Sequence, residues 1–366
     1  MKKYIAFLVL SVLSVSGVMA KRVAVVDAVD ASPLVGATVF SSSGLILGTT
    51  DVDGFTPDVS ASLFPLNVRS LGYREGVASV MCDTLKMIAD TYTLPEVTVV
   101  PGDRPITRVI YYAREYDTGA TDRDTLKLFS EYMIDTYNVE KNAKVKGYRR
   151  YDSIPKLKAV KRYAHYTGAD GCDSVASPED ADYISNIRML FSADVDMDEP
   201  EAILNGAVTD TIMGKYSWGA VAKKSGGLFT VTVDVLSNYK NHKYSPNFMK
   251  LLGLTTDFRE LSLSFVYNAN DRGKYNIHDL IYRVTSANLL CRGKWIKKEF
   301  KTKNPVEMNS YVELYPIEIN YLTVEEYMEL RDDKTKMEFR EPDNLQPLLP
   351  AVERIIKRVN SSGIKL

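Results

Sequence analysis

The chain has 366 residues, which is enough for two or three domains of ordinary size and a sizeable hydrophobic core. This length excludes a mini-protein that depends on disulfide bonds for its stability. The 46 lysines and arginines nearly balance the 47 aspartates and glutamates, so no nucleic-acid partner is expected. Hydrophobic residues make up 45% of the chain and charged residues 25%, which is typical of a folded protein rather than a disordered one.

Residues 1–20 have the three-part pattern of a secretory signal peptide. Lys2 and Lys3 precede an apolar run, and a tail of small residues ends at Ala20. The run is shorter than the roughly 20 residues that a membrane-spanning helix needs, which favours cleavage after Ala20 over an uncleaved anchor. We therefore expect an exported mature chain with 44 basic and 47 acidic residues, a net charge of −3, in the periplasm or associated with the outer membrane.

The expected mature chain begins at Lys21. A bacterial lipoprotein has a lipid-modified cysteine at this position, so this kind of lipid attachment is not expected here. No later segment is apolar enough to predict a transmembrane span. The three cysteines have neither CxxC pairing nor the spacing of metal ligands, and they permit at most one internal disulfide. Three separate and mostly buried thiols are the simpler expectation. The cysteines are Cys82, Cys172 and Cys291.

Between residues 21 and 100, short apolar stretches alternate with turn residues. The turn clusters recur about every eight to twelve residues, which is typical of a small antiparallel β-sandwich. Asp51 and Asp53 resemble the start of a calcium loop, but Ser62 stands where an EF-hand has glutamate. A tight turn at Asp53-Gly54 is the better interpretation. Strands are expected around residues 23–25, 33–40, 46–50, 66–71, 77–80 and 92–100.

Several sequence elements of this region occur together in a recognisable order: Asp27, PLVGATV (33–39), TDVDGF (50–55), LGY (71–73) and LPEVTV (94–99). With this combination, residues 21–100 resemble the carboxypeptidase regulatory-like domain that is common in exported Bacteroidota proteins. The resemblance implies a transthyretin-like β-sandwich without catalytic activity. The chain departs from the family in its first strand, where residues 23–26 are apolar and contain no glycine.

The family name raises the question of peptidase chemistry, which the sequence does not support. Metallocarboxypeptidases bind zinc through a His-x-x-Glu pair and a distant histidine, but His165, His242 and His278 are not followed by glutamate at this spacing. HExxH, GxSxG and phosphate-loop patterns are also absent from the sequence. His278 and Asp279 are a weak candidate for part of a triad, because neighbouring residues seldom take these roles. We predict no catalytic residue, metal site or cofactor.

Two membrane-protein hypotheses are also disfavoured. The same module often precedes the plug and barrel of TonB-dependent receptors, but about 22 strands of about ten residues each, together with a plug, exceed the 266 residues after residue 100. An outer-membrane anchor in the C-terminal region is disfavoured because residues 294–301 (KWIKKEFK), interpreted as a strand, carry too much charge for contact with lipid.

Residues 101–105 contain two prolines and are interpreted as a stiff linker. Residues 106–366 are interpreted as one α+β domain that is mostly antiparallel. Apolar residues at helical spacing over 122–137 predict an amphipathic helix. The capping box Thr323-Val324-Glu325-Glu326 predicts a short helix to about Arg331, and an apolar stripe from Leu348 to Val359 predicts a C-terminal helix. Strands are expected at 229–235, 261–267 and 311–321, the last interrupted at Pro316, with turns at 223–227 and 270–273.

The charge of this region is unevenly placed. Residues 141–162 have a net charge of +8, and residues 163–201 have a net charge of −9. One interpretation makes the basic block a site for anionic lipid headgroups or glycans and residues 194–199 a calcium loop. Solvated loops and mutual pairing are the simpler interpretation, because charge runs need no ligand to be stable. Trp218 and Trp295 are candidates for stacking on a carbohydrate, with core packing as the commoner role.

These patterns predict an N-terminal all-β sandwich over 21–100, followed by a mixed, mostly antiparallel α+β region over 106–366. The expected role is non-catalytic binding or scaffolding in the cell envelope, with an envelope protein or a glycan as the partner. The alternative is a hydrolase with a carboxylate-based site in residues 106–366. A deep cleft with converging acids would favour the hydrolase, and a flat or shallow surface would favour binding.

Overall fold

The structure is a computed structural model that describes residues 20–90, 103–121, 125–139, 145–148, 155–167, 173–175, 197–212, 219–237, 253–300, 302–343 and 345–362. Strands make up 52% of the described residues and helices 11%. Most strands belong to large antiparallel sheets, so the expected β-rich, antiparallel character is confirmed. Helices contribute less than a mixed α+β region implies.

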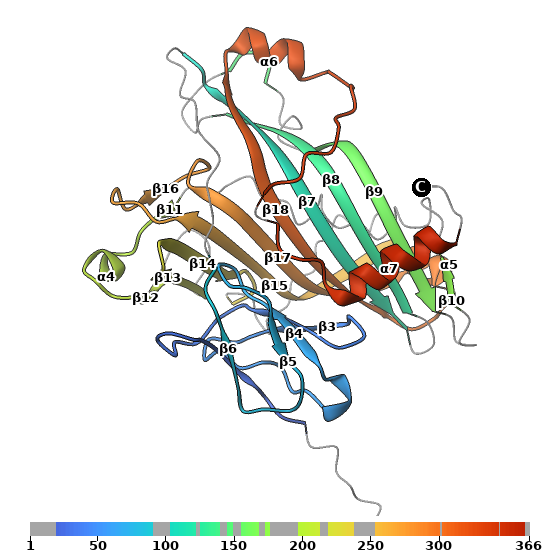
Figure 1. The fold of residues 1–366 in the computed structure, drawn as a ribbon. Coiled ribbons are helices and arrows are strands. Elements are labelled where there is room, and N and C mark those ends of the chain that lie inside the picture. The colour runs from blue at the N-terminus through green and yellow to red at the C-terminus, as the bar shows by residue number, and fades with distance from the viewer. Residues whose placement is uncertain are drawn as a thin grey trace, which may run out of the picture.

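Residues 20–90, named the N-terminal unit below, form two small sheets around one core (Figure 1). One sheet has the strand order β3-β2-β4-β5, and β1 pairs with β6 in parallel. Val25, Val39 and Val68 are buried between the sheets because alternate residues of each strand point inward. The bounds are Ala24–Asp27 for β1, Thr38–Phe40 for β2, Ile46–Thr49 for β3, Ala61–Leu63 for the 3-10 turn η1, Leu66–Arg69 for β4, Gly76–Ala78 for β5 and Thr84–Met87 for β6.

Five of the strands expected in this unit coincide at least in part with β1 to β5. β6 was not expected, because Thr84 and Lys86 interrupt its short apolar pattern. The strand expected at 92–100 lies outside the described residues, as do residues 101–102 of the expected linker.

A single ten-stranded sheet forms the rest of the architecture (Figure 1). Its order is β10-β9-β8-β7-β18-β17-β15-β14-β13-β12, and all neighbours are antiparallel. The bounds are Ile106–Ala120 for β7, Thr125–Val139 for β8, Lys156–Thr167 for β9, Asp173–Val175 for β10, Thr209–Ile212 for β12, Ala220–Ser225 for β13, Leu228–Asp234 for β14, Leu254–Asn268 for β15, Leu280–Gly293 for β17 and Val306–Leu322 for β18. A separate pair joins β11 (Met197–Asp198) to β16 (Lys274–Tyr275).

The two faces of this sheet carry different partners. In β7, Tyr111 and Ala113 belong to a core that includes Ile296 of α5 (Lys294–Glu299). The intervening Tyr112 belongs to a second core, on the opposite face, that includes Val352 of α7 (Pro350–Ser361) and residues of the N-terminal unit. The N-terminal unit and the C-terminal helix therefore cover one face together.

Glycines of the N-terminal unit lie where its loops approach the rest of the molecule. A Cβ atom on Gly44 would lie 2.2 Å from Cβ of Ala351 in α7, and one on Gly36 would lie 2.4 Å from Cγ2 of Thr232 in β14. Both glycines have positive φ angles, 83° and 73°, which other residues seldom adopt. The glycine in the PLVGATV element therefore permits both a turn and close packing against the sheet.

A buried ion pair joins the N-terminal unit to the sheet. The guanidinium of Arg69, at the end of β4, donates from Nη1 to Oε1 of Glu313 in β18 at 2.9 Å, and the two side chains are 7% and 1% exposed. Arg69 also pairs with Glu75 at 3.2 Å and donates to the carbonyl of Pro347. Tyr311 and Tyr315 donate to the same Glu313 carboxylate, so each of its two oxygens accepts at least one hydrogen bond.

The segment between the last two helices lies along the face that carries α7. This segment, residues 332–343 and 345–349, is named the C-terminal strap. Arg114 of β7 donates to the carbonyl of Gln346 at 2.7 Å, and Lys158 of β9 donates to the carbonyl of Asp333 at 2.6 Å. The ammonium of Lys161 lies 4.1 Å from the ring centroid of Phe339. Basic side chains of the sheet thus hold the backbone of the strap.

The helix expected over residues 122–137 is wrong, because β8 (Thr125–Val139) occupies this segment. Phe129 and Met133 face the core beneath α7, whereas Leu128 and Tyr132 face the opposite core. A strand that is buried on both faces has apolar residues at nearly every position, so some of them inevitably fall at helical spacing.

The charged segment at 294–301, interpreted as a strand, contains α5 (Lys294–Glu299) instead. Short charged segments are weakly specified by local pattern, and here Ile296 packs onto the sheet as one turn of helix. The capping box is confirmed: Thr323 and Glu326 form its reciprocal hydrogen bonds at the start of α6 (Val324–Leu330). The C-terminal helix is confirmed as α7, and a short helix, α4 (Glu201–Leu204), was not expected.

We predict that Arg69→Ala lowers the free energy of unfolding by about 3–5 kcal/mol, because the buried Glu313 carboxylate loses its counter-charge. Urea denaturation followed by circular dichroism measures this change. Arg74→Ala is the matched control, since Arg74 is 67% exposed in its pair with Asp90 and should change stability by less than about 1 kcal/mol. Equal effects of the two substitutions would contradict the prediction.

Candidate functional site

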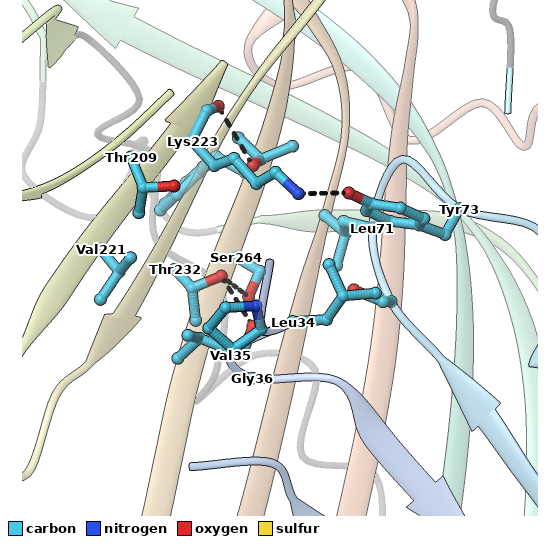
Figure 2. A pocket seen from close by; sticks show the side chains of 14 residues that line it. Leu34, Val35, Gly36, Leu71, Tyr73, Thr209, Val221, Lys223, Thr232 and Ser264 are labelled. Carbon is cyan, nitrogen blue, oxygen red and sulfur yellow. Dashed lines mark hydrogen bonds between the residues drawn. The ribbon is translucent and has the colours of Figure 1, made fainter. Parts of the chain in front are cut away.

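A small cavity lies at the junction between the N-terminal unit and the ten-stranded sheet. Its volume is about 40 Å³, and it is lined by Leu34, Gly36 and Tyr73 from one side and by Lys223 and Ser264 from the other. Figure 2 shows Lys223 extending toward Tyr73 across this junction. The volume is sufficient for one or two water molecules and too small for a substrate.

The polar wall of this cavity is a compact hydrogen-bonded network. The Lys223 ammonium donates to the Asp27 carboxylate at 3.1 Å, to Oγ of Ser32 at 2.6 Å and to the hydroxyl of Tyr73 at 2.9 Å. Tyr73 in turn donates to Asp27 at 2.6 Å. The side chains of Asp27 and Lys223 are only 2% and 10% exposed, so the network joins the two parts of the molecule through a desolvated ion pair.

The protonation states in this network indicate a structural role, which is to attach the N-terminal unit to the sheet. Burial by itself raises the pKa of Asp27, but the hydrogen bonds from Tyr73, the Val29 amide and Lys223 outweigh burial and hold this pKa below its ordinary value. Burial, together with the bond to Asp27, raises the pKa of Tyr73 far above its ordinary value. A carboxylate that stays ionised and a phenol that stays protonated do not exchange protons near neutral pH.

A larger hollow lies at the opposite end of the sheet, beside α6. It has a volume of about 610 Å³, within the range of ordinary ligand sites. Its wall contains the consecutive residues 317–322 of β18, together with Arg104, Arg108, Glu326 and Leu330. Consecutive residues of one strand line a hollow when its edge, and not one of its faces, borders the space. This hollow is named the fork groove below.

The fork groove exists because β18 extends past its neighbour. The ladder between β17 and β18 ends at the pair Arg283 and Leu314, whereas the ladder between β18 and β7 continues to Leu322. In Figure 1, β18 continues toward α6 while β17 turns toward β16. Pro316 and a register shift before Glu318 mark the point where the strands part, as expected for a proline at a strand edge.

The charged groups of the fork groove are all paired. Arg108 donates to both carboxylate oxygens of Asp135, at 2.9 and 3.0 Å, and Arg104 donates to Glu326 at 2.8 Å. Glu318 pairs with Arg340 at 2.7 Å and accepts from Asn320 at 2.8 Å. The groove therefore presents little unbalanced charge to a ligand.

Neither acid of the groove is suited to donate a proton. Burial alone raises the pKa of Glu318, but the hydrogen bonds from Arg340 and Asn320 outweigh it, and the result is a lowered pKa. The hydrogen bond from the Thr323 amide lowers the pKa of Glu326. Both groups are carboxylates at neutral pH, whereas a hydrolase of the glycosidase type needs one carboxyl group with a raised pKa.

The weak triad candidate does not assemble. The Asp279 carboxylate accepts from Arg272 at 2.6 Å, from Asn270 at 3.2 Å and from the Asn276 amide at 3.1 Å. The His278 ring instead forms a hydrogen bond with the hydroxyl of Tyr321, across the mouth of the fork. Asp279 therefore orders the turn before β17, and His278 links the two sides of the fork.

Most of the two charge blocks lies outside the described residues, including Asp194, Asp196 and the basic residues at 141, 144, 149 and 150. Of the described members, Lys158 and Lys161 contact the C-terminal strap. Glu199 is buried and accepts from Lys224 at 3.0 Å and from Tyr275 at 2.7 Å. The described part of the expected calcium loop therefore has a protein cation as its counter-charge. The side chains of Trp218 and Trp295 also lie outside the described residues.

Cys82 and Cys291 are free thiols, and Cys172 lies outside the described residues. Burial raises the pKa of Cys291 to about 11, so this thiol is not a nucleophile at neutral pH. His165 lies in β9, and His242 lies outside the described residues. Within the described ranges, no group of three His, Cys, Asp or Glu side chains is placed to hold a metal ion.

The residues of the fork groove were not singled out from the sequence. Proline in the middle of an apolar alternating stretch was the available signal, because proline in a strand indicates an edge or a bulge. Pro316 interrupts the strand expected at 311–321, but the sequence does not show that β17 stops pairing there. That fact depends on the register between strands that are distant along the chain.

No protein-family model matches the chain, and no curated protein matches it. Among solved structures, the chain is similar to a lipovitellin structure whose title names lipid–protein interactions. The sequence identity is 12% and the TM-score is 0.26. The similarity covers 60% of this chain and 25% of the lipovitellin chain. A similarity of this size does not establish a shared fold. None of the described helices combines the length and hydropathy needed to cross a membrane.

We predict that Asp27→Asn lowers the free energy of unfolding by about 3–5 kcal/mol at pH 7, because Lys223 loses its buried counter-charge and keeps only Asp30, which is 37% exposed and 3.9 Å away. The folded-state pKa of Asp27 lies below its unfolded value of about 3.9, so its contribution exists above that pH and is lost as the pH falls through the folded pKa. Urea denaturation at a series of pH values should therefore show the difference from wild type shrinking below about pH 4. Asp53→Asn, in an exposed turn, is the control, and a difference independent of pH would contradict the prediction.

Proposed function

We propose that this protein is a non-catalytic, exported component of the cell envelope that binds a partner through the fork groove. The observation that carries the proposal is the combination of an open groove of about 610 Å³ with charged groups that are all paired. A binding surface needs space and a stable shape, whereas a hydrolytic site needs at least one group poised to transfer a proton.

We also propose that residues 21–100 form a carboxypeptidase regulatory-like, transthyretin-like sandwich. Two sheets with a common core support this assignment. Two elements of the resemblance meet in space, since Tyr73 of LGY donates to Asp27 at 2.6 Å. Gly54 in the TDVDGF element has a φ angle of 78°, as the expected turn requires. In this protein, the module would serve to brace the ten-stranded sheet.

Rigid attachment of the N-terminal unit fits a scaffolding role. The Arg69–Glu313 and Asp27–Lys223 pairs are both buried, and they lie on different strands of the two parts. Arg354 of α7 adds a hydrogen bond to the carbonyl of Ser42 at 2.8 Å. Several separate attachments resist rotation of one part against the other, which keeps a surface formed by the sheet in a fixed orientation.

The purified mature chain should not hydrolyse chromogenic peptides, esters or glycosides faster than buffer does. Because Glu318 is the partly buried acid of the groove, Glu318→Gln serves as the matched variant, with Glu338→Gln at an exposed position of the C-terminal strap as its control. Turnover that disappears in Glu318→Gln and persists in Glu338→Gln would establish the hydrolase alternative and overturn the non-catalytic proposal.

Export is tested separately. Expression of the full chain in a Gram-negative host should yield an envelope-fraction protein whose N-terminus is Lys21, as measured by intact mass and N-terminal sequencing. Substitution of Ala20 by Pro should block cleavage, because signal peptidase requires a small residue at this position. A cytosolic product that retains Met1 would refute export.

A further inference from the structure

We propose that the fork groove binds an extended, largely uncharged peptide segment of a partner protein, which adds to the outer edge of β18 as a further strand. This inference rests on the proposed binding function and specifies its ligand. The wall of the groove supplies the observation: residues 317–322 of one strand border it consecutively.

The edge of β18 lacks a neighbouring strand in this part of the sheet. From Tyr315 to Leu322, β7 is the ladder partner on one side, and the described ranges contain no strand paired on the other. Main-chain donors and acceptors alternate along such an edge, and the carbonyl of Tyr321 near its end accepts from Arg104 at 2.8 Å. An extended polypeptide has the complementary row of groups, and strand addition to an exposed edge is an established mode of peptide recognition.

Burial changes along β18 where its second neighbour is lost. Residues 311–316 are buried, whereas residues 317–321 are half-buried. Ile317 and Ile319 therefore keep part of their apolar surface accessible beside the open edge. An added strand would cover this apolar surface and complete the ladder of β18, and both changes favour binding.

Aromatic side chains pack tightly at the closed end of the fork, where β17 and β18 part. The rings of Tyr282 in β17 and Tyr315 in β18 stack with centroids 5.1 Å apart and an interplanar angle of 14°. The ring of Tyr112 lies 6.5 Å from that of Tyr315. Because these aromatic residues hold the end of the fork, its opening is a fixed feature of the core and does not depend on local unfolding.

The charge pattern limits the occupant. Arg104, Arg108, Glu318 and Glu326 each have an opposite charge in contact. A charged side chain of the peptide would therefore be desolvated in the groove without a free counter-charge, which disfavours acidic and basic segments. Uncharged segments with alternating small polar and apolar side chains fit the edge best.

Selection from a phage-displayed library of random dodecapeptides on the mature wild-type chain provides the probe. Synthetic copies of the selected peptides are then methylated at one backbone nitrogen at a time, and their affinity is measured by fluorescence anisotropy. A strand that pairs along one edge uses every second amide, so affinity should fall about tenfold or more at alternate positions and little at the positions between them. Uniform insensitivity to methylation, or failure to select any peptide, would overturn the proposal.

Hydrogen exchange locates the binding site independently. Amides within residues 317–322 should gain protection when the selected peptide is added, and protection confined to other segments would refute the proposal. Ile319→Lys and Asn320→Lys should weaken binding about tenfold or more, because lysine on an edge strand opposes pairing. Val77→Lys, in the edge strand β5 of the N-terminal unit, should bind as the wild type does.

Asn320→Lys guards against loss of folding, since Asn320 is already polar and half-buried and its replacement should leave the chain folded. Unchanged binding by folded Asn320→Lys, with no protection at 317–322, would refute the site even if the protein proves non-catalytic. Enzymatic turnover would refute the proposed function, whereas failure of peptide binding alone would refute only the ligand.

Discussion

The buried ion pair between Arg69 and Glu313 is the interaction on which the arrangement of the molecule most depends. It places a charge from β4 of the N-terminal unit against a charge from β18, near the centre of the ten-stranded sheet. The Coulomb attraction offsets the cost of removing both ions from water only when their remaining hydrogen bonds are satisfied. Tyr311 and Tyr315 donate to Glu313, and Glu75 and the carbonyl of Pro347 accept from Arg69. Within this pair, only Nε of Arg69 has no hydrogen-bond partner among the described residues, and the bond to Pro347 lets the pair also position the C-terminal strap.

This arrangement leaves the two ends of the sheet with different properties. One face is covered by the N-terminal unit and α7, and the small cavity between the N-terminal unit and the sheet is a joint of about 40 Å³. At the far end, β18 extends beyond β17 and an open edge borders a groove of about 610 Å³. The firm attachment at one end and the open strand edge at the other are the features on which the proposed binding role rests.

Local residue patterns predicted those parts of the fold that depend on neighbouring residues. The turn at Asp53-Gly54, the capping box at Thr323 and the alternating strand at 229–235 require only a few adjacent residues, and all three are present. The helix expected at 122–137 failed because β8 is buried on both faces, and two-sided burial removes the period of two by which a strand is recognised. The candidate site was missed for a different reason. Pro316 indicates a strand edge, but it does not show that β17 is the strand that stops pairing there.

The sequence by itself determined a β-rich, antiparallel chain with short helices at Thr323 and near the C-terminus, because strand alternation, turn geometry and helix capping act over a few residues. The tertiary structure alone decided which charges meet and which edges stay open. Arg69 and Glu313 are 244 positions apart, and the end of the β17 ladder at Arg283 depends on strand register. Such long-range pairings leave no periodic signal in the chain, since they are selected by the packing of the whole sheet.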